Sequence, residues 1–195
     1  GIPAGTPASF DVIKKNIGGK STSRPLDFSK NFIGDGAGWG SYPGNEEQRK
    51  WRTSVPMTKY EEFRDMYNKA GINIHILKVS PATWSDEEID YAYKAAIALG
   101  SIGITDEYSE TAINRLGKFA EKHGSLAMYH THGQPAEPGF SFDPIFAASP
   151  ANYLNLDAGH YYGATGLHPN EIIIKYHDKM RSIHIKDKTG PNSTP

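Results

Sequence analysis

Five short apolar segments recur along the chain at nearly constant intervals, with helical segments between them. Measured between Ile74, Gly103, Met128, Asn155 and His184, the steps are 29, 25, 27 and 29 residues by subtraction of residue numbers. A strand and a helix repeated at this spacing are typical of parallel α/β folds, in which every crossover is long. A complete (β/α)₈ barrel takes about 250 residues, whereas this chain has 195. We therefore predict an α/β fold, a (β/α)₈ TIM barrel that is incomplete in this chain.

Helix caps and apolar periodicity place the individual elements. Thr58, with Glu61 three residues later, matches a capping box, and Ser85 precedes acidic residues suited to a first helical turn. The predicted helices are 58–70, 86–99, 110–122, 142–148 and 170–179, and the predicted strands are 72–77, around 102, 126–130, around 153 and 182–186.

Residues 1–57 differ in composition from the rest and are predicted to form a loop-rich N-terminal segment. Gly, Pro, Ser and Asn are dense there, with one short helix expected at 10–16 and one short strand expected at 31–33. The glycines at 34–38 lack the Gly-Lys-Ser/Thr ending of a phosphate loop. The βα-repeat region is expected to span residues 58–195.

Charge and composition exclude several function classes. The net charge is −1 and the basic residues are scattered, so the sequence shows no basic cluster of the kind that binds nucleic acid or an anionic membrane. The absence of cysteine excludes disulfides and thiolate metal sites. No apolar run is long enough to span a bilayer, and no signal peptide is visible. We expect a cytoplasmic protein, or a periplasmic or secreted one if a signal peptide has been removed, and a homo-oligomer is compatible with the sequence.

Polar side chains used in acid–base and metal chemistry follow four of the apolar segments. The clusters are Asp106-Glu107, His130-Thr131-His132, Asp157 with His160, and His184 with Lys186-Asp187. Active sites of parallel α/β proteins lie at the carboxyl ends of the strands. A site contributed by several strands is difficult to explain by packing alone, so we predict an enzyme.

Two of these clusters have both a functional and a structural interpretation. His130 and His132 are expected to face the same side of a strand, where they could bind a divalent ion, act as base and orienter, or simply form a hydrogen-bonded pair. Asp157 could be paired or metal-bound, or it could cap the following segment. Gly159 is expected to turn the backbone sharply and direct His160 toward the site.

The other two clusters also leave alternatives open. His184 and Lys186 share one face if the strand continues through both, and a lysine there suits stabilisation of an oxyanion or enediolate. A solvated strand end with a surface Lys–Asp pair is the alternative. Glu107 could be a metal ligand or an acid at the entry to a helix.

Two motifs in order resemble the sugar phosphate isomerase/epimerase family of xylose-isomerase-like TIM barrels. They are Asn155-Leu156-Asp157-Ala158-Gly159-His160 and the segment from His177 to Asp187, which ends in His184-Ile185-Lys186-Asp187. The resemblance covers residues 60–187. It implies a divalent ion (Mn²⁺, Mg²⁺, Co²⁺ or Zn²⁺) and acid–base chemistry beside the carbonyl of a small-molecule sugar.

The resemblance also implies roles for individual residues. Asp157 and His184 match metal ligands of the family, while His130 stands where many members have glutamate. Glu107 is therefore a candidate third ligand that supplies the missing carboxylate. His130 or His132 would act as the base, and the residues expected to orient the substrate and stabilise the enediolate are His160 and Lys186.

Three rival functions remain open at this point. Relatives with histidine in place of the glutamate include lyases and hydratases, so a 3-keto-glycoside lyase or hydratase is a close alternative. A DNA-repair endonuclease of the same superfamily would need a basic DNA-binding face, which the net charge of −1 argues against. A non-catalytic barrel fragment that serves as a binding or assembly module is the third.

Overall fold

The computed structural model describes residues 46–193, and the helix and strand expected at 10–16 and 31–33 lie outside them. The described part alternates strands and helices along most of its length. The helices are α2 (Glu46–Ser54), α3 (Met57–Lys69), α4 (Asp86–Ala98), α5 (Glu110–Lys122), α6 (Asp143–Ala148), α7 (Ala158–Thr165) and α8 (Asn170–Tyr176), with the 3₁₀ turns η2 (Gln134–Ala136) and η3 (His177–Lys179). The strands are β1 (Leu77–Lys78), β2 (Gly103–Glu107), β3 (Leu126–His130), β4 (Asn152–Asp157) and β5 (Met180–His184).

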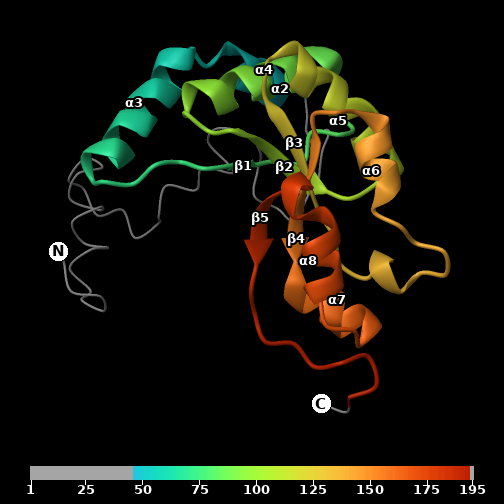
Figure 1. Cartoon of the computed structure of the whole chain (residues 1–195). Coiled ribbons are helices and arrows are strands. Elements are labelled where there is room, and N and C mark those ends of the chain that lie inside the picture. The colour runs from blue at the N-terminus through green and yellow to red at the C-terminus, as the bar shows by residue number, and fades with distance from the viewer. Residues whose placement is uncertain (1–45, 194–195) are drawn as a thin grey trace.

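The five strands form one sheet in the order β1-β2-β3-β4-β5, and every neighbouring pair is parallel. Figure 1 shows the sheet with α3, α4 and α5 arrayed along it and with the chain after β5 running past α7. Sequential parallel strands with one helical crossover each are the arrangement of a TIM barrel. The prediction of an α/β fold and an incomplete barrel is confirmed.

The hydrophobic core lies between the sheet and its helices. Ile104, Tyr129 and Leu154 point from three adjacent strands into one buried cluster with Ile89 of α4 and Leu116 of α5. Successive side chains along a strand alternate between faces, so the strand residues directly before and after each of these three point to the opposite face of the sheet. That opposite face contains the polar groups identified from the sequence.

Helix starts follow the sequence signals at one position and not at another. Ser85 caps α4 through a complete capping box with Glu88, and the N-cap predicted there is confirmed. The capping box predicted at Thr58 is wrong, because α3 begins at Met57 behind Pro56 and has no side-chain cap. Pro56 has the extended backbone conformation of an N-cap residue, and it places Thr58 inside the first turn.

Several element boundaries also differ from the predictions. β1 has two residues in place of the predicted strand 72–77, and residues 46–54, within the segment predicted to be loop-rich, form α2. The last strand ends at His184, so Lys186 lies in the segment after β5. In the described part of the chain, no helix combines the length and apolar character that crossing a membrane requires.

Candidate active site

The four polar residues at the centre of the site are the last residues of four adjacent strands. Glu107 ends β2, His130 ends β3, Asp157 ends β4 and His184 ends β5. Glu107 is in register with His130, and Asp157 is in register with His184. The parallel sheet therefore brings four positions, separated by up to 77 residues (184 − 107), to one edge.

Asp157 is the most buried of these groups and has the largest number of polar neighbours. Its side chain has no exposed surface, and its Oδ2 lies 3.1 Å from Nε2 of His130 and 3.4 Å from Nδ1 of His184. The ammonium of Lys186 lies 2.7 Å from the same oxygen. The other oxygen, Oδ1, accepts a hydrogen bond from the backbone N–H of His160 at 2.8 Å. Asp157 therefore caps α7, as one interpretation of the sequence proposed, and also lies inside the polar cluster.

Glu107 forms the second anionic point of the cluster. Its Oε2 lies 3.0 Å from Nδ1 of His130 and 3.0 Å from Nε2 of His132. Its Oε1 accepts a hydrogen bond from the ammonium of Lys78 at 2.6 Å. His130 thus has one ring nitrogen toward Glu107 and the other toward Asp157. A histidine held this way has a fixed ring orientation.

Both carboxylates are stabilised in the charged form. Burial opposes ionisation of Glu107, but hydrogen bonds from His130 and Lys78 outweigh it and lower its pKa to about 2. Burial also opposes ionisation of Asp157, yet Lys186, the N–H of His160 and His130 lower its pKa well below the ordinary value. The site therefore presents two anionic oxygen donors at neutral pH.

The remaining imidazoles surround this pair. Ring centroids of His132 and His160 lie 4.3 Å apart, and that of His184 lies 4.8 Å from that of His130. Burial lowers the pKa of His160, and burial followed by the proximity of His130 lowers the pKa of His184. Both side chains are therefore neutral at pH 7, which is the form that coordinates metal ions.

Two groups of side chains in the described residues have ligand atoms within 4.8 Å of one another. One is His130, Asp157 and His184, and the other is His130, His132 and His160. Neither group includes Glu107. The first supplies two imidazoles and a carboxylate, a donor set compatible with a divalent transition metal that retains open coordination positions. The donor chemistry of the site thus fits the divalent ion expected from the sequence.

Two local predictions about this site need correction. β3 ends at His130, so His132 lies in the loop and not on the strand, although the two rings do meet on one side, with centroids 4.5 Å apart. Gly159 does not turn the backbone, because it lies within α7 and its φ is not positive. Its close contact with Lys186 is a different reason for glycine at this position.

Sequence reasoning missed Lys78. Its strand is only two residues long, and β1 follows a segment without regular structure. The pairing of Lys78 with Thr105, two residues before Glu107, brings it to the site. A lysine that ends a short apolar run was the available signal, since the other strand ends show the same pattern.

The fold is that of an incomplete TIM barrel with five parallel strands. The structure resembles a sugar phosphate isomerase/epimerase from Parabacteroides distasonis, with a TM-score of 0.55 and 17% identity over 69% of this chain and 61% of that chain. It also resembles a xylose isomerase domain protein from Planctomyces limnophilus, with a TM-score of 0.52 and 19% identity over 68% of this chain and 59% of that one. The resemblance predicted from the two motifs is confirmed at the level of the fold.

Sequence comparison finds shorter matches. Inosose dehydratases from Clostridium botulinum and Clostridium beijerinckii are 32% and 31% identical over 78 residues, which is 38% of this chain and 26% of each relative. No family model matches the chain. The chain therefore aligns with about a quarter of the curated relatives and about three fifths of the two solved structures.

Proposed function

We propose that this chain contributes the active site of a metal-dependent sugar isomerase or epimerase that removes a proton next to a carbonyl group. The observation that supports this most directly is the convergence of Asp157, His130 and His184 from three strand ends on one point. In this proposal these three residues hold a divalent ion. The bound ion would supply Lewis-acid polarisation of the sugar carbonyl.

Glu107 has an orienting role in this proposal, in place of the ligand role expected from the sequence. It contacts Nδ1 of His130, so the N–H at that position can donate to the carboxylate while Nε2 keeps its lone pair. Metal-ligating histidines usually have a carboxylate on the second nitrogen. Glu107 also contacts Nε2 of His132, which leaves Nδ1 of His132 as the basic nitrogen.

His132 is the preferred general base. Its side chain is 45% exposed, whereas that of His130 is 6% exposed, so a substrate can approach His132 more easily. The proton on the carbon beside the carbonyl would pass to Nδ1 of His132, with the imidazolium stabilised by Glu107. In an epimerase a second proton donor would deliver a proton to the same carbon from the opposite face, and His132 would release its proton to solvent. In an isomerase His132 would return the proton to the neighbouring carbon, while a hydroxyl proton moves between the two oxygens.

Lys186 and His160 have supporting roles in the proposal. The ammonium of Lys186 lies beside Asp157, where it can stabilise negative charge that develops on the carbonyl oxygen. His160 lies next to His132 and is neutral at pH 7, so it can hydrogen-bond a sugar hydroxyl. These assignments name a small-molecule sugar as the ligand.

A dehydratase or lyase is the second candidate, and the inosose dehydratases among the relatives favour it. The first step would be the same proton transfer to His132. The electron pair would then form a carbon–carbon double bond and expel the β-substituent, which takes up a proton and leaves as water or as the aglycone of a 3-keto-glycoside. The two candidate functions use the same site, but only the second eliminates a substituent from the sugar.

The test measures metal content and carbon-bound proton exchange together. The purified full chain is loaded with Mn²⁺, Co²⁺, Mg²⁺ or Zn²⁺, and incubated in D₂O with a ketose, a keto-inositol and a 3-keto-glucoside. Deuterium incorporation with isomer formation supports the first candidate, and formation of the unsaturated ketone that remains after loss of water or aglycone supports the second. Failure of every metal to bind, or of every substrate to exchange, would overturn the proposal.

A further inference from the structure

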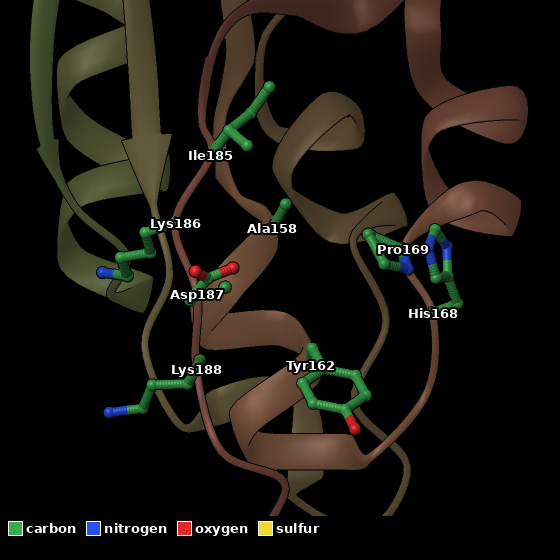
Figure 2. A pocket seen from close by; sticks show the side chains of 9 residues that line it. Ala158, Tyr162, His168, Pro169, Ile185, Lys186, Asp187 and Lys188 are labelled. Carbon is green, nitrogen blue, oxygen red and sulfur yellow. The ribbon is translucent and has the colours of Figure 1, made fainter.

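The segment after β5, residues 185–188, lies directly against α7. Figure 2 shows Ile185, Lys186, Asp187 and Lys188 along this segment, with the side chains of Lys186 and Lys188 extending away from Tyr162. A cavity of about 260 Å³, lined in part by Tyr162 and Asp187, lies in this region. The position of Lys186 in the site therefore depends on how closely this segment approaches α7.

Gly159 is the point of closest approach. A Cβ atom at this position would lie 2.5 Å from Cγ of Lys186 and 2.8 Å from its carbonyl oxygen. Contacts below 3.0 Å to a backbone atom cannot be relieved by rotating a side chain. Since the φ of Gly159 is not positive, glycine is required here by space and not by backbone conformation.

Gly163 lies one turn further along α7 and differs in the nature of its contact. A Cβ atom there would meet Cγ of Lys188 at 2.6 Å and Cε at 3.0 Å, and the three nearest atoms all belong to that side chain. The side chain of Lys188 can move aside at little cost. The two glycines therefore form a matched pair on one helix, one facing the backbone and the other facing a flexible side chain.

We propose that Gly159 is a positioning residue that allows the segment 185–188 to pack against α7 and so directs Lys186 toward Asp157. The contacts form a continuous sequence, from Gly159 to the backbone of Lys186 and from its ammonium to Oδ2 of Asp157 at 2.7 Å. Gly159 touches neither the cation position nor the substrate in this scheme. It acts through Lys186, and its catalytic consequence rests on the proposed function.

A function-independent experiment tests the geometry first. Full-length wild type, G159A and G163A are treated with a limiting amine-acetylating reagent, and the labelling rates of Lys186 and Lys188 are read by mass spectrometry. We expect severalfold faster labelling of Lys186 in G159A, because its ammonium leaves Asp157, and unchanged labelling of Lys186 in G163A. Equal labelling of Lys186 in all three folded proteins would overturn the proposal. If G159A does not fold, G159A/K186A, which lacks the Cγ atom that the added Cβ would meet, is compared with K186A. Faster labelling of Lys188 in the double variant supports displacement of the segment, and equal labelling overturns the proposal.

A double-mutant cycle then tests the catalytic consequence. In deuterium exchange, G159A is expected to lower the rate about 10- to 100-fold in the wild-type background, since a displacement of about 1 Å can cost 100-fold. In the K186M background the same change should alter the rate less than about 2-fold, because the group that Gly159 positions is gone. An equal loss in both backgrounds would refute the positioning role. Absence of exchange in the wild type would instead refute the proposed function. The labelling experiment would still show whether Gly159 positions Lys186.

Discussion

Asp106 and Glu107 are neighbours on β2, but they lie on opposite faces of the sheet and have opposite pKa shifts. Asp106 faces the helices, where it is buried and accepts a hydrogen bond from the N–H of Ala82, and burial raises its pKa. Glu107 faces the site, where the hydrogen bonds from His130 and Lys78 overcome burial and lower its pKa to about 2. The helix-facing side of the sheet thus penalises charge, whereas the site-facing side stabilises it.

The same division holds for β3 and β4. Tyr129 and Leu156 lie in the core, and the residue after each of them, His130 and Asp157, points to the opposite face and belongs to the polar cluster. The two faces therefore separate two tasks within the same strands. Substitutions on the helix-facing side should change stability, and substitutions on the site-facing side should change metal binding and catalysis.

The largest expected effect is on the helix-facing side, at Asn152. Its amide donates to the carbonyl oxygens of Ile113 and Ile145, and its Oδ1 accepts from the hydroxyl of Tyr129. N152A should lower the free energy of unfolding by about 3–5 kcal/mol, because several buried polar groups lose their partner. The measurement is chemical denaturation followed by circular dichroism.

The control for N152A is Y129F, which removes one hydroxyl and leaves the Asn152 amide bonds in place. The expected loss is about 1–2 kcal/mol. A loss below about 1 kcal/mol for N152A itself would show that this side of the sheet is not where stability is concentrated.

The second prediction concerns the site-facing side, at Asp157. D157N keeps the shape of the side chain and an oxygen that can accept from the N–H of His160, but it removes the charge beside His130 and Lys186. We expect divalent-ion affinity to fall by about 100-fold or more, since even outer-shell changes cost 10–100-fold. The free energy of unfolding without metal should also fall, because the folded protein stabilises the charged form of Asp157, but the loss should be smaller than in N152A.

Calorimetric titration with Co²⁺ or Zn²⁺ measures the first quantity, and denaturation in a chelating buffer measures the second. N152A is the matched control, since it should lose stability and retain ion affinity while folded. A stability loss in D157N as large as that in N152A would contradict the division between the faces.

The sequence predicted the residues that lie at the carboxyl ends of long apolar strands, but it did not predict the length of β1 or the place of Lys78. The strand at 126–130 and the approach of Asp157 to His184 followed from apolar runs that end in polar residues, because parallel strands bring their carboxyl ends to one edge. The length of β1 could not be predicted in this way, since most of the apolar run 72–77 lies outside the sheet. Lys78 was missed for that reason.

Gly159 shows a second limit of the sequence. Its place in the motif marked it as special, but a glycine next to a helix start is compatible with a turn or with a close contact. Only the approach of Lys186 in three dimensions distinguishes the two. The spacing of residues along the chain does not predict the contact between Gly159 and Lys186.

The third prediction uses pH to separate the faces at Asp106. Its pKa is raised in the folded state, so its contribution to stability is present below the ordinary value of 3.8 and is lost as pH rises through the folded value. D106N should therefore flatten the decline in unfolding free energy above pH 4 that this group causes. Denaturation at a series of pH values, compared with the wild type, measures the difference. Identical pH profiles for the two proteins would show that Asp106 does not carry this penalty.

The smallest and most specific effect is expected at Lys78. The K78M substitution removes the ammonium at 2.6 Å from Oε1 of Glu107 while keeping an unbranched side chain. The pKa of Glu107 should rise from about 2 toward its ordinary value of 4.5, although not all the way, because His130 still donates to the carboxylate. The measurement is an NMR titration of the carboxyl carbon of Glu107 in the metal-free protein.

The sign of the associated stability change follows from the same shift. In the wild type, the contribution of Glu107 is present above about pH 4.5 and is lost as the pH falls toward 2. K78M should reduce that contribution, and it should also raise the pKa of the helix-facing Asp106 further, because the charge of Lys78 lowers that pKa as well. If the titration of Glu107 is unchanged in K78M, its low pKa is due to the histidines alone. The site-facing side would then stabilise charge through the same imidazoles that we assign to metal binding, and no lysine would be needed to explain the contrast with Asp106.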